Sequence, residues 1–224
     1  MGDTLYGEPA MAERSHEQVW NPLSSGVDPR SETPGIDEAA LAEPLAWDQP
    51  SLVTVAPGAD LFAAPVSRAD IERIVSIVAA TAQHFYLVLT TSVKRLLALG
   101  NDGLSFPRNL WIGVPVESDE DVWRAEDLLR CNTSRAWVVV DPIAGPLPSL
   151  PVSMLAWVVC RIPATGEADP FGLGWVRDLR DRCVAAGVPF RFEERSGDGS
   201  RSSRELDGRT WDQQPTDLLP SSDR

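Results

Sequence analysis

The chain has 224 residues, of which 43% are hydrophobic and 24% are charged. This balance is typical of a globular protein and excludes a wholly disordered or collagen-like chain. The formal net charge is −13, and residues 1–60 alone contain 11 acidic and 2 basic side chains. Lys94 is the single lysine and the arginines are scattered, so the clustered cations needed for general DNA or RNA binding are missing.

The start of the chain has neither a basic segment followed by an apolar one nor any run of 18 apolar residues. We therefore expect a soluble, cytoplasmic protein without a membrane partner. The three cysteines, Cys131, Cys160 and Cys183, are widely spaced and form no zinc-type pattern with His16 or His84. Buried free thiols are the expected outcome, in place of a disulfide framework or a structural zinc site.

Composition divides the chain into three parts. Residues 1–50 are acidic and rich in proline and glycine, which predicts an irregular N-terminal arm. Residues 51–195 carry the apolar periodicity of a folded domain. Residues 196–224 are polar and rich in glycine and serine, which predicts a partly disordered tail.

Within the central part, apolar runs rich in β-branched and aromatic residues predict buried strands. The six runs cover residues 52–55, 85–89, 110–114, 136–140, 155–159 and 188–192. Trp111, Trp137 and Trp157 each lie near the start of a run and are expected to pack within the sheet or barrel.

Helix signals separate these strands. Ser67 with Asp70 forms a capping box, Ser118 with Asp121 opens a second helix, and Gly187 ends a third. Alternating strands and helices predict an α/β fold with a parallel sheet. Periodicity alone leaves an open doubly wound sheet and an incomplete (β/α) barrel as alternatives.

In either fold the ligand site lies at the carboxyl ends of the strands, so the polar residues there are the candidates. The candidate residues are Asp60, Thr90, Asp141, Arg161 and Glu193. The carboxylates of Asp60, Asp141 and Glu193 suit an acid/base pair or a hard-metal site. The alternative is that each carboxylate caps the helix that follows it. Neither histidine follows a strand, and no phosphate-binding glycine motif occurs, so Ser/His/Asp catalysis and nucleotide binding are not expected.

Nine segments together, in their order and spacing, resemble a phage-associated family of radical S-adenosylmethionine-like proteins of unknown function with a three-cysteine motif. The segments are VWNP (19–22), TPGIDEA (33–39), EPLAWDQP (43–50), ADLF (59–62), FYLVLT (85–90), NLWIGVPVES (109–118), DPIAGP (141–146), LRDRCVAAGVPFRF (179–192) and LDGRTWD (206–212). The resemblance implies a parallel-stranded incomplete (β/α) barrel, a TIM-like half barrel of six to seven strands.

Family members with the motif look like partial barrels that hold a [4Fe–4S] cluster on three thiolates. The family pattern places those thiolates at Gly26, Ile36 and Ala39, none of which can bind iron. The family's glycine-rich turn falls on residues 160–163, and its Lys-Arg pair falls on residues 91–92, so both are lost as well. The resemblance therefore implies a degenerate member without a cofactor or a metal.

From this we expect a non-catalytic pseudoenzyme that acts as a protein-binding or regulatory protein. Its partner would be a host or phage protein, or an intact paralogue. Two alternatives stay open. One is a small-molecule enzyme that uses the strand-end carboxylates without a cluster, and the other is an acidic decoy of a nucleic-acid-binding protein. In the pseudoenzyme reading, the five candidate residues line a vestigial pocket.

Overall fold

The protein is an α/β half barrel, seen here in a computed structural model. The structure describes residues 16–23, 35–131, 133, 135–163, 172–195 and 202–218. Seven parallel strands follow one another in chain order across a curled sheet, and a short eighth strand pairs antiparallel with the seventh. The strands are β1 (His16–Trp20), β2 (Ser51–Val55), β3 (Phe85–Leu89), β4 (Leu110–Pro115), β5 (Ala136–Val140), β6 (Trp157–Pro163), β7 (Phe190–Arg195) and β8 (Ser202–Ser203).

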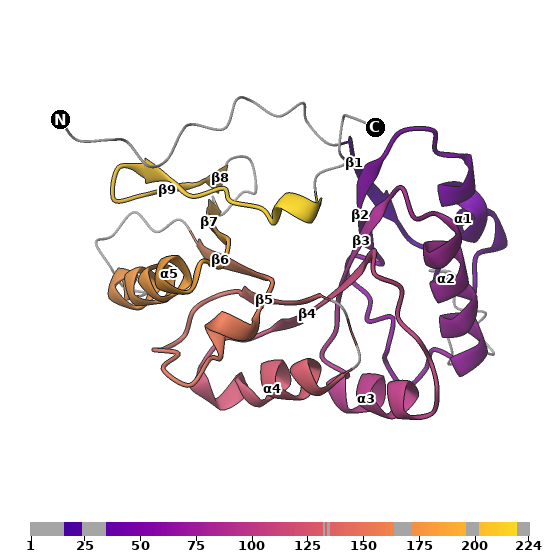
Figure 1. The fold of residues 1–224 in the computed structure, drawn as a ribbon, viewed down its shortest axis with the longest axis horizontal. Coiled ribbons are helices and arrows are strands. Elements are labelled where there is room, and N and C mark those ends of the chain that lie inside the picture. Colours follow the sequence, from indigo (N-terminus) through magenta and orange to yellow (C-terminus); the bar gives the residue numbers. More distant parts are fainter. Residues whose placement is uncertain are drawn as a thin grey trace.

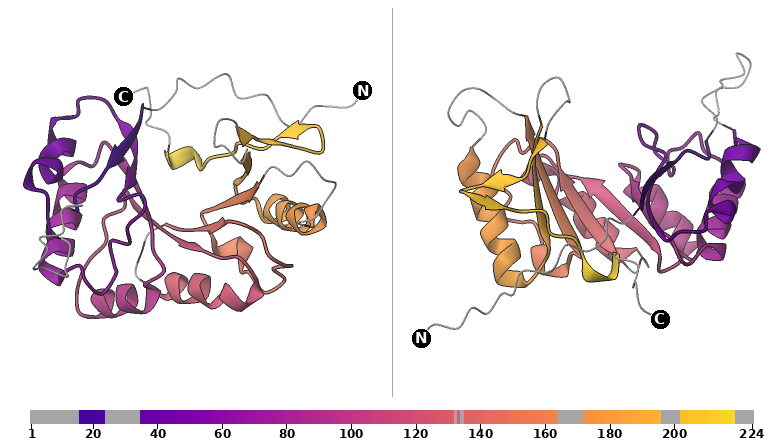
Figure 2. Two further views of the ribbon diagram at one scale, coloured as in Figure 1. Left: turned by 180° about the vertical axis from the view of Figure 1, so that it is seen from behind. Right: turned by 90° about the horizontal axis from the view of Figure 1, so that it is seen from above.

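Helices cover the convex side of this sheet, and the concave side is left open between its two arms (Figures 1 and 2). The α-helices are α1 (Glu38–Ala42), α2 (Arg68–Ala80), α3 (Val93–Asn101), α4 (Trp123–Arg130) and α5 (Leu173–Ala186). Short 3₁₀ turns are η1 (Glu43–Ala46), η2 (Asp119–Asp121), η3 (Val152–Met154) and η4 (Thr216–Leu218).

The strand order decides between the two folds that periodicity left open. A doubly wound sheet reverses direction at a switch point, with helices on both faces. Here each parallel strand pairs with the next one along the chain and the order never reverses. The prediction of an incomplete (β/α) barrel of six to seven strands is therefore confirmed.

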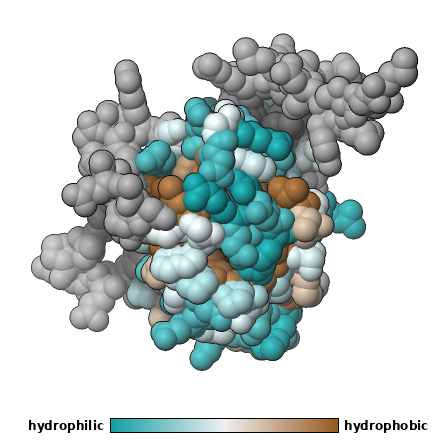
Figure 3. Space-filling model, turned by 90° about the vertical axis from the view of Figure 1, so that its left-hand side faces the viewer, coloured by the Kyte–Doolittle hydropathy of each residue, from teal (hydrophilic) through white to brown (hydrophobic). Residues whose placement is uncertain are grey.

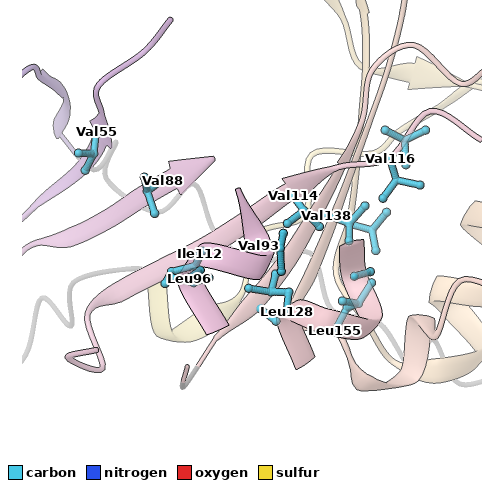
Figure 4. Close-up of a cluster of buried hydrophobic side chains, with 14 of the residues drawn as sticks. Val55, Val88, Val93, Leu96, Ile112, Val114, Val116, Leu128, Val138 and Leu155 are labelled. Atoms are coloured by element: carbon cyan, nitrogen blue, oxygen red, sulfur yellow. The ribbon is translucent and has the colours of Figure 1, made fainter. Parts of the chain in front are cut away.

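Side chains that alternate along the strands form two separate cores. On the convex side, valines and isoleucines such as Ile112, Val114 and Val138 pack against Leu96 of α3 and Leu128 of α4 (Figure 4). On the concave side, a smaller cluster is formed by Leu52, Trp111, Trp137, Val139, Trp157, Val159 and Leu218. The convex face is apolar because helices cover it, and part of the concave face is apolar because the tryptophans and Leu218 pack there, which together explain the near-continuous hydrophobicity of the strands.

Two of the three helix signals work as predicted. The Ser67 hydroxyl accepts a hydrogen bond from the backbone N–H of Asp70 at 3.1 Å, and α2 begins at Arg68, directly after Ser67. Helix α5 ends at Gly187, whose φ of 67° is readily adopted by glycine. Ser118 differs, because its side chain makes no capping hydrogen bond and η2 precedes α4.

Regular structure extends into the N-terminal segment that we expected to be an irregular arm. Strand β1 pairs with β2 in parallel, and α1 and η1 follow it. The indole of Trp20 is fully buried, and its Nε1 donates to the carbonyl of Ala40 at 2.8 Å. Residues 16–23 and 35–50 thus belong to the folded body, since Trp20 and Leu41 complete its convex core.

The predicted polar tail is also partly ordered. The strands β9 (Glu205–Leu206) and β10 (Arg209–Thr210) form a hairpin, and η4 follows. The side chains of Trp211 and Leu218 are buried. Leu218 joins the concave cluster, so the C-terminal segment covers part of that face (Figure 1).

Among the described residues, every helix is too short or too polar to cross a membrane.

Candidate functional site

The concave side of the half barrel holds a cavity of about 600 Å³. Its apolar lining includes Leu52, Leu87, Trp137, Trp157 and Val159. Its polar lining comes from the two outer arms of the sheet, namely Glu17 and Gln18 of β1, Thr54 of β2, Arg161 of β6, and Arg191 and Glu193 of β7. A mainly apolar hollow of this size with a few convergent polar groups is the usual form of a small-molecule site.

The two tryptophans of the cavity wall are fixed in place. The Trp137 ring lies across Gly113 of β4, where an added Cβ would come within 2.4 Å of Trp137 Cε2. Trp137 Nε1 donates to the carbonyl of Trp111 at 3.3 Å, and Trp157 Nε1 donates to the carbonyl of Gln213 at 3.0 Å. The two ring centroids lie 5.6 Å apart. The wall is therefore rigid before any ligand arrives.

A carboxylate shared by two guanidinium groups lies at the polar end of the cavity. Glu193 Oε2 accepts from Arg161 Nε at 2.8 Å, and Glu193 Oε1 lies 2.7 Å from Arg191 Nη2. Burial would raise the pKa of Glu193, but the charges of Arg191, Arg161 and Arg195 outweigh it and lower the pKa. Glu193 therefore stays ionised and serves as a counter-ion.

The network continues outward through Asp141, which follows β5. Its Oδ2 lies 3.6 Å from Arg161 Nη1 and 3.3 Å from Arg195 Nη1. We expected Arg161 and Glu193 just beyond their strands, but β6 and β7 run on to Pro163 and Arg195. Both residues lie inside the paired strands, directly opposite each other in the register.

The sequence analysis missed two members of this network, Arg195 at the end of β7 and Arg191 in the cavity wall. The side chain of Arg191 is only 14% exposed, and its Nε is enclosed without an acceptor among the described residues. Burial lowers the pKa of Arg191, while Glu193 and Glu17 act in the opposite direction. The overlooked signal is its place between Phe190 and Phe192, because strand alternation puts Arg191 on the face opposite these two core residues.

Asp60 and Thr90 lie elsewhere and do not line the cavity. Asp60 accepts hydrogen bonds from the Thr90 hydroxyl at 2.8 Å, the Thr91 N–H at 3.0 Å, the Ser92 hydroxyl at 3.0 Å and the Phe62 N–H at 2.9 Å. These bonds join the loop after β2 to the loop that opens α3. Of the proposed vestigial pocket, the structure brings together Asp141, Arg161 and Glu193, and it gives Asp60 and Thr90 a loop-anchoring role.

The three cysteines are buried and free, as predicted. Burial raises the pKa of Cys131 to about 11 and that of Cys183 to about 12, and it also raises the pKa of Cys160. Cys160 and Cys183 belong to the convex core. Their position and high pKa make them poor ligands for a metal in the cavity.

The sequence resemblance predicts the positions of the cluster thiolates at Gly26, Ile36 and Ala39. Ile36 forms an isolated bridge with Leu23, Ala39 is in α1, and Gly26 lies outside the described residues. Within the described part of the chain, no group of three or more His, Cys, Asp or Glu side chains is placed to hold a metal ion. His84 is fully buried at the edges of the rings of Trp47 and Tyr86.

The face formed by α5 and the β9–β10 hairpin differs from the cavity. It is mainly hydrophilic, with small and separate hydrophobic areas (Figure 3). Asp207 at the tip of the hairpin pairs with Arg177 at 2.8 Å and with Arg180 at 2.7 Å. These contacts attach the hairpin to α5 and lower the pKa of Asp207 to about 2.

Comparison with known proteins gives a family without an assigned activity. Residues 3–215 match the model of a family described as a protein of unknown function (DUF5131). Neither the search of curated proteins nor the search of solved structures gave a match.

Proposed function

The chain belongs to the DUF5131 family, and we propose that it is a non-catalytic, radical S-adenosylmethionine-like member that acts by binding a protein partner. One observation carries the proposal: the three strand-end carboxylates predicted for the site, those of Asp60, Asp141 and Glu193, are all engaged by other groups of the chain. In a (β/α) barrel, catalytic groups lie at these strand ends. Asp60 is saturated by loop donors, and Asp141 and Glu193 are paired with arginines.

General acid/base catalysis needs a group that changes protonation near the working pH. Glu193 has a lowered pKa because two guanidinium groups contact it, so it does not release or take up a proton there. His84 is enclosed in the convex core, away from the cavity. This supports a binding role over the alternative of a small-molecule enzyme.

The residues at the cluster positions support the loss of iron–sulfur chemistry. Soft thiolates hold cluster iron, and side chains such as Ile36 and Ala39 supply no donor atom. Anaerobic reconstitution with iron and sulfide, followed by metal and sulfide assays, tests this step. We expect substoichiometric iron and no visible charge-transfer band. Stoichiometric iron with such a band would refute the pseudoenzyme proposal.

Charge supports a basic protein as the partner, whether it is a host protein, a phage protein or an intact paralogue. Residues 1–60 carry 11 acidic and 2 basic side chains, and Glu43 and Asp48 are exposed. Exposed acidic groups attract a basic surface and accelerate association, and salt weakens the effect. Removing residues 1–42 would also remove β1 and α1, so single charges should be changed instead.

The test is affinity capture with the full chain, followed by association kinetics at about 0.1 M and 1 M salt. The variant Glu43→Gln/Asp48→Asn should associate more slowly at low salt and show a weaker salt dependence. The control Asp178→Asn/Glu205→Gln changes the charge equally at exposed positions on α5 and β9. Equal association rates for both variants would refute the role of the acidic N-terminal segment.

A further inference from the structure

Arg191 in the wall of the cavity has an unmet hydrogen-bonding need. Its Nε is buried and has no acceptor among the residues that the structure describes, while its Nη2 contacts Glu193. A buried donor without an acceptor is costly, and the cost is greater for a charged group. The Arg191 guanidinium also lines the cavity, so its positive charge attracts an anionic oxygen of a ligand that lies there.

The charges around Arg191 leave a small positive excess. Arg191, Glu193, Arg161, Asp141 and Arg195 form a continuous chain of ion pairs with three cations and two anions. This local charge of +1 occurs in a protein whose formal net charge is −13.

Two further charged groups act on Arg191 from neighbouring elements. Glu17 of β1 lines the same cavity, and Arg204, between β8 and β9, has the opposite effect on the pKa of Arg191. With both included, the local excess is still +1, which favours an anion of single charge. A dianion such as a phosphate would meet the carboxylates of Glu17 and Glu193 with nothing to balance its second charge.

The rest of the cavity suits an apolar body. Leu52, Leu87, Trp137, Trp157 and Val159 contribute to its wall. The two indoles are held by hydrogen bonds to backbone carbonyls, so the wall needs no rearrangement on binding. A volume of about 600 Å³ lies within the range of about 300–1,000 Å³ that is usual for small-molecule sites.

We propose that this cavity binds a small apolar monocarboxylic acid, whose carboxylate contacts Arg191 and whose body lies against Trp137 and Trp157. The site is separate from the exposed acidic side chains that we assign to partner binding, so either proposal can fail without the other. A carboxylate oxygen of the ligand contacts the part of the Arg191 guanidinium that lines the cavity, while Glu193 keeps Arg161 neutralised.

Matched probes test the proposal with the full chain. 2-Naphthoate offers a flat apolar carboxylate, octanoate offers a flexible one, and 2-naphthamide is the neutral counterpart of the first. Calorimetry and intrinsic tryptophan fluorescence should show binding of at least one of the two acids. The amide should bind about tenfold more weakly than naphthoate, or worse, because it lacks the charge-assisted hydrogen bond.

Three variants locate the binding. Arg191→Gln should weaken binding of the acid by about tenfold or more, since it removes the guanidinium and its charge. Thr54→Trp should block the cavity sterically, because Thr54 is exposed on β2 and lines it. Arg130→Gln is the charge-matched control, because Arg130 is 68% exposed on α4, on the convex side.

Thermal melting of each variant checks that it is folded, and Thr54→Trp keeps the test valid if Arg191→Gln is not. Carboxylate-dependent binding that both cavity variants reduce and Arg130→Gln leaves unchanged would support the proposal. Failure of both acids to bind at millimolar concentration would overturn it. Equal binding of acid and amide, or binding that neither cavity variant changes, would also overturn it.

Discussion

Gly113 is the position where the addition of a single methyl group should disturb the concave side most. It lies in β4 opposite Trp137 of β5, and the indole crosses it. A Cβ built there would lie 2.4 Å, 2.7 Å and 2.8 Å from Cε2, Cδ2 and Cζ2 of Trp137. The ring has little freedom to move, because Trp137 is only 4% exposed and its ring lies beside that of Trp157.

Gly113→Ala should therefore lower the free energy of unfolding. Overpacking of this kind costs about 1–3 kcal/mol. Displacing the indole also weakens its hydrogen bond to the carbonyl of Trp111, which is worth about 1 kcal/mol. The reduced entropy of the unfolded chain returns roughly 0.5–1 kcal/mol. The net expectation is a loss of about 1–3 kcal/mol.

Urea unfolding monitored by tryptophan fluorescence and far-UV circular dichroism measures this loss. Gly145→Ala is the matched control, because a Cβ at Gly145 meets nothing within 4 Å and its φ is not positive. The control should stay within about 0.5 kcal/mol of the parent. A second control is the double variant with Trp137→Leu, which takes the clashing ring away.

In the Trp137→Leu background, Gly113→Ala should cost at least about 1 kcal/mol less than in the parent, because residues in contact couple. Strictly additive costs would show that the ring does not lie across Gly113. A Gly113→Ala variant as stable as the parent would refute the reasoning directly.

Three further predictions concern buried polar groups. Asp60→Ala should lower the free energy of unfolding by about 2–4 kcal/mol, because it leaves the hydrogen-bond donors of two loops without an acceptor. Urea unfolding measures this loss, and a loss below about 0.5 kcal/mol would contradict the anchoring role. Burial lowers the pKa of His84 below its ordinary value of 6.5. As the pH falls below 6.5, His84 is therefore protonated in the unfolded chain while it stays neutral in the folded chain. Stability should fall as pH drops from 6.5 toward the folded pKa, and His84→Gln should flatten this slope; an unchanged slope would contradict the assignment. The thiols of Cys131, Cys160 and Cys183 should react with Ellman's reagent only after unfolding, because they are buried and their pKa values are raised; rapid reaction of the folded protein would contradict their burial.

The sequence analysis placed the elements with strong local signals. Each of the six apolar runs overlaps a strand, and the capping box at Ser67 and the glycine at 187 mark helix boundaries as expected. It missed α3, because the residue three positions after Ser92 is Arg95 and no capping-box signal marks the start of the helix. It also missed β1 and the ordered C-terminal segment, whose stability comes from distant contacts such as that between Trp20 and Ala40.

The candidate site divides in the same way. Residue types near strand ends pointed to Asp141, Arg161 and Glu193, and these three do form one network. The same reasoning grouped Asp60 with them, but its carboxylate turns to the loop donors of Thr90, Thr91 and Ser92. A strand-end position fixes the edge of the sheet on which a residue lies, and it does not fix the neighbour that the side chain reaches.

By itself the sequence determined the α/β class, the parallel sheet and most of its strands, because apolar periodicity and capping are local properties of the chain. Periodicity left open whether the strands curl into a half barrel; the family resemblance implied it, and the tertiary structure decided it, because strand order depends on contacts between distant segments. The tertiary structure also decided that β6 and β7 extend far enough to place Arg161 opposite Glu193 and Arg191 beside the indoles. Strand length and sheet curvature depend on the hydrogen bonds and packing contacts that neighbouring strands and the C-terminal segment provide. The sequence of a single strand does not contain that information.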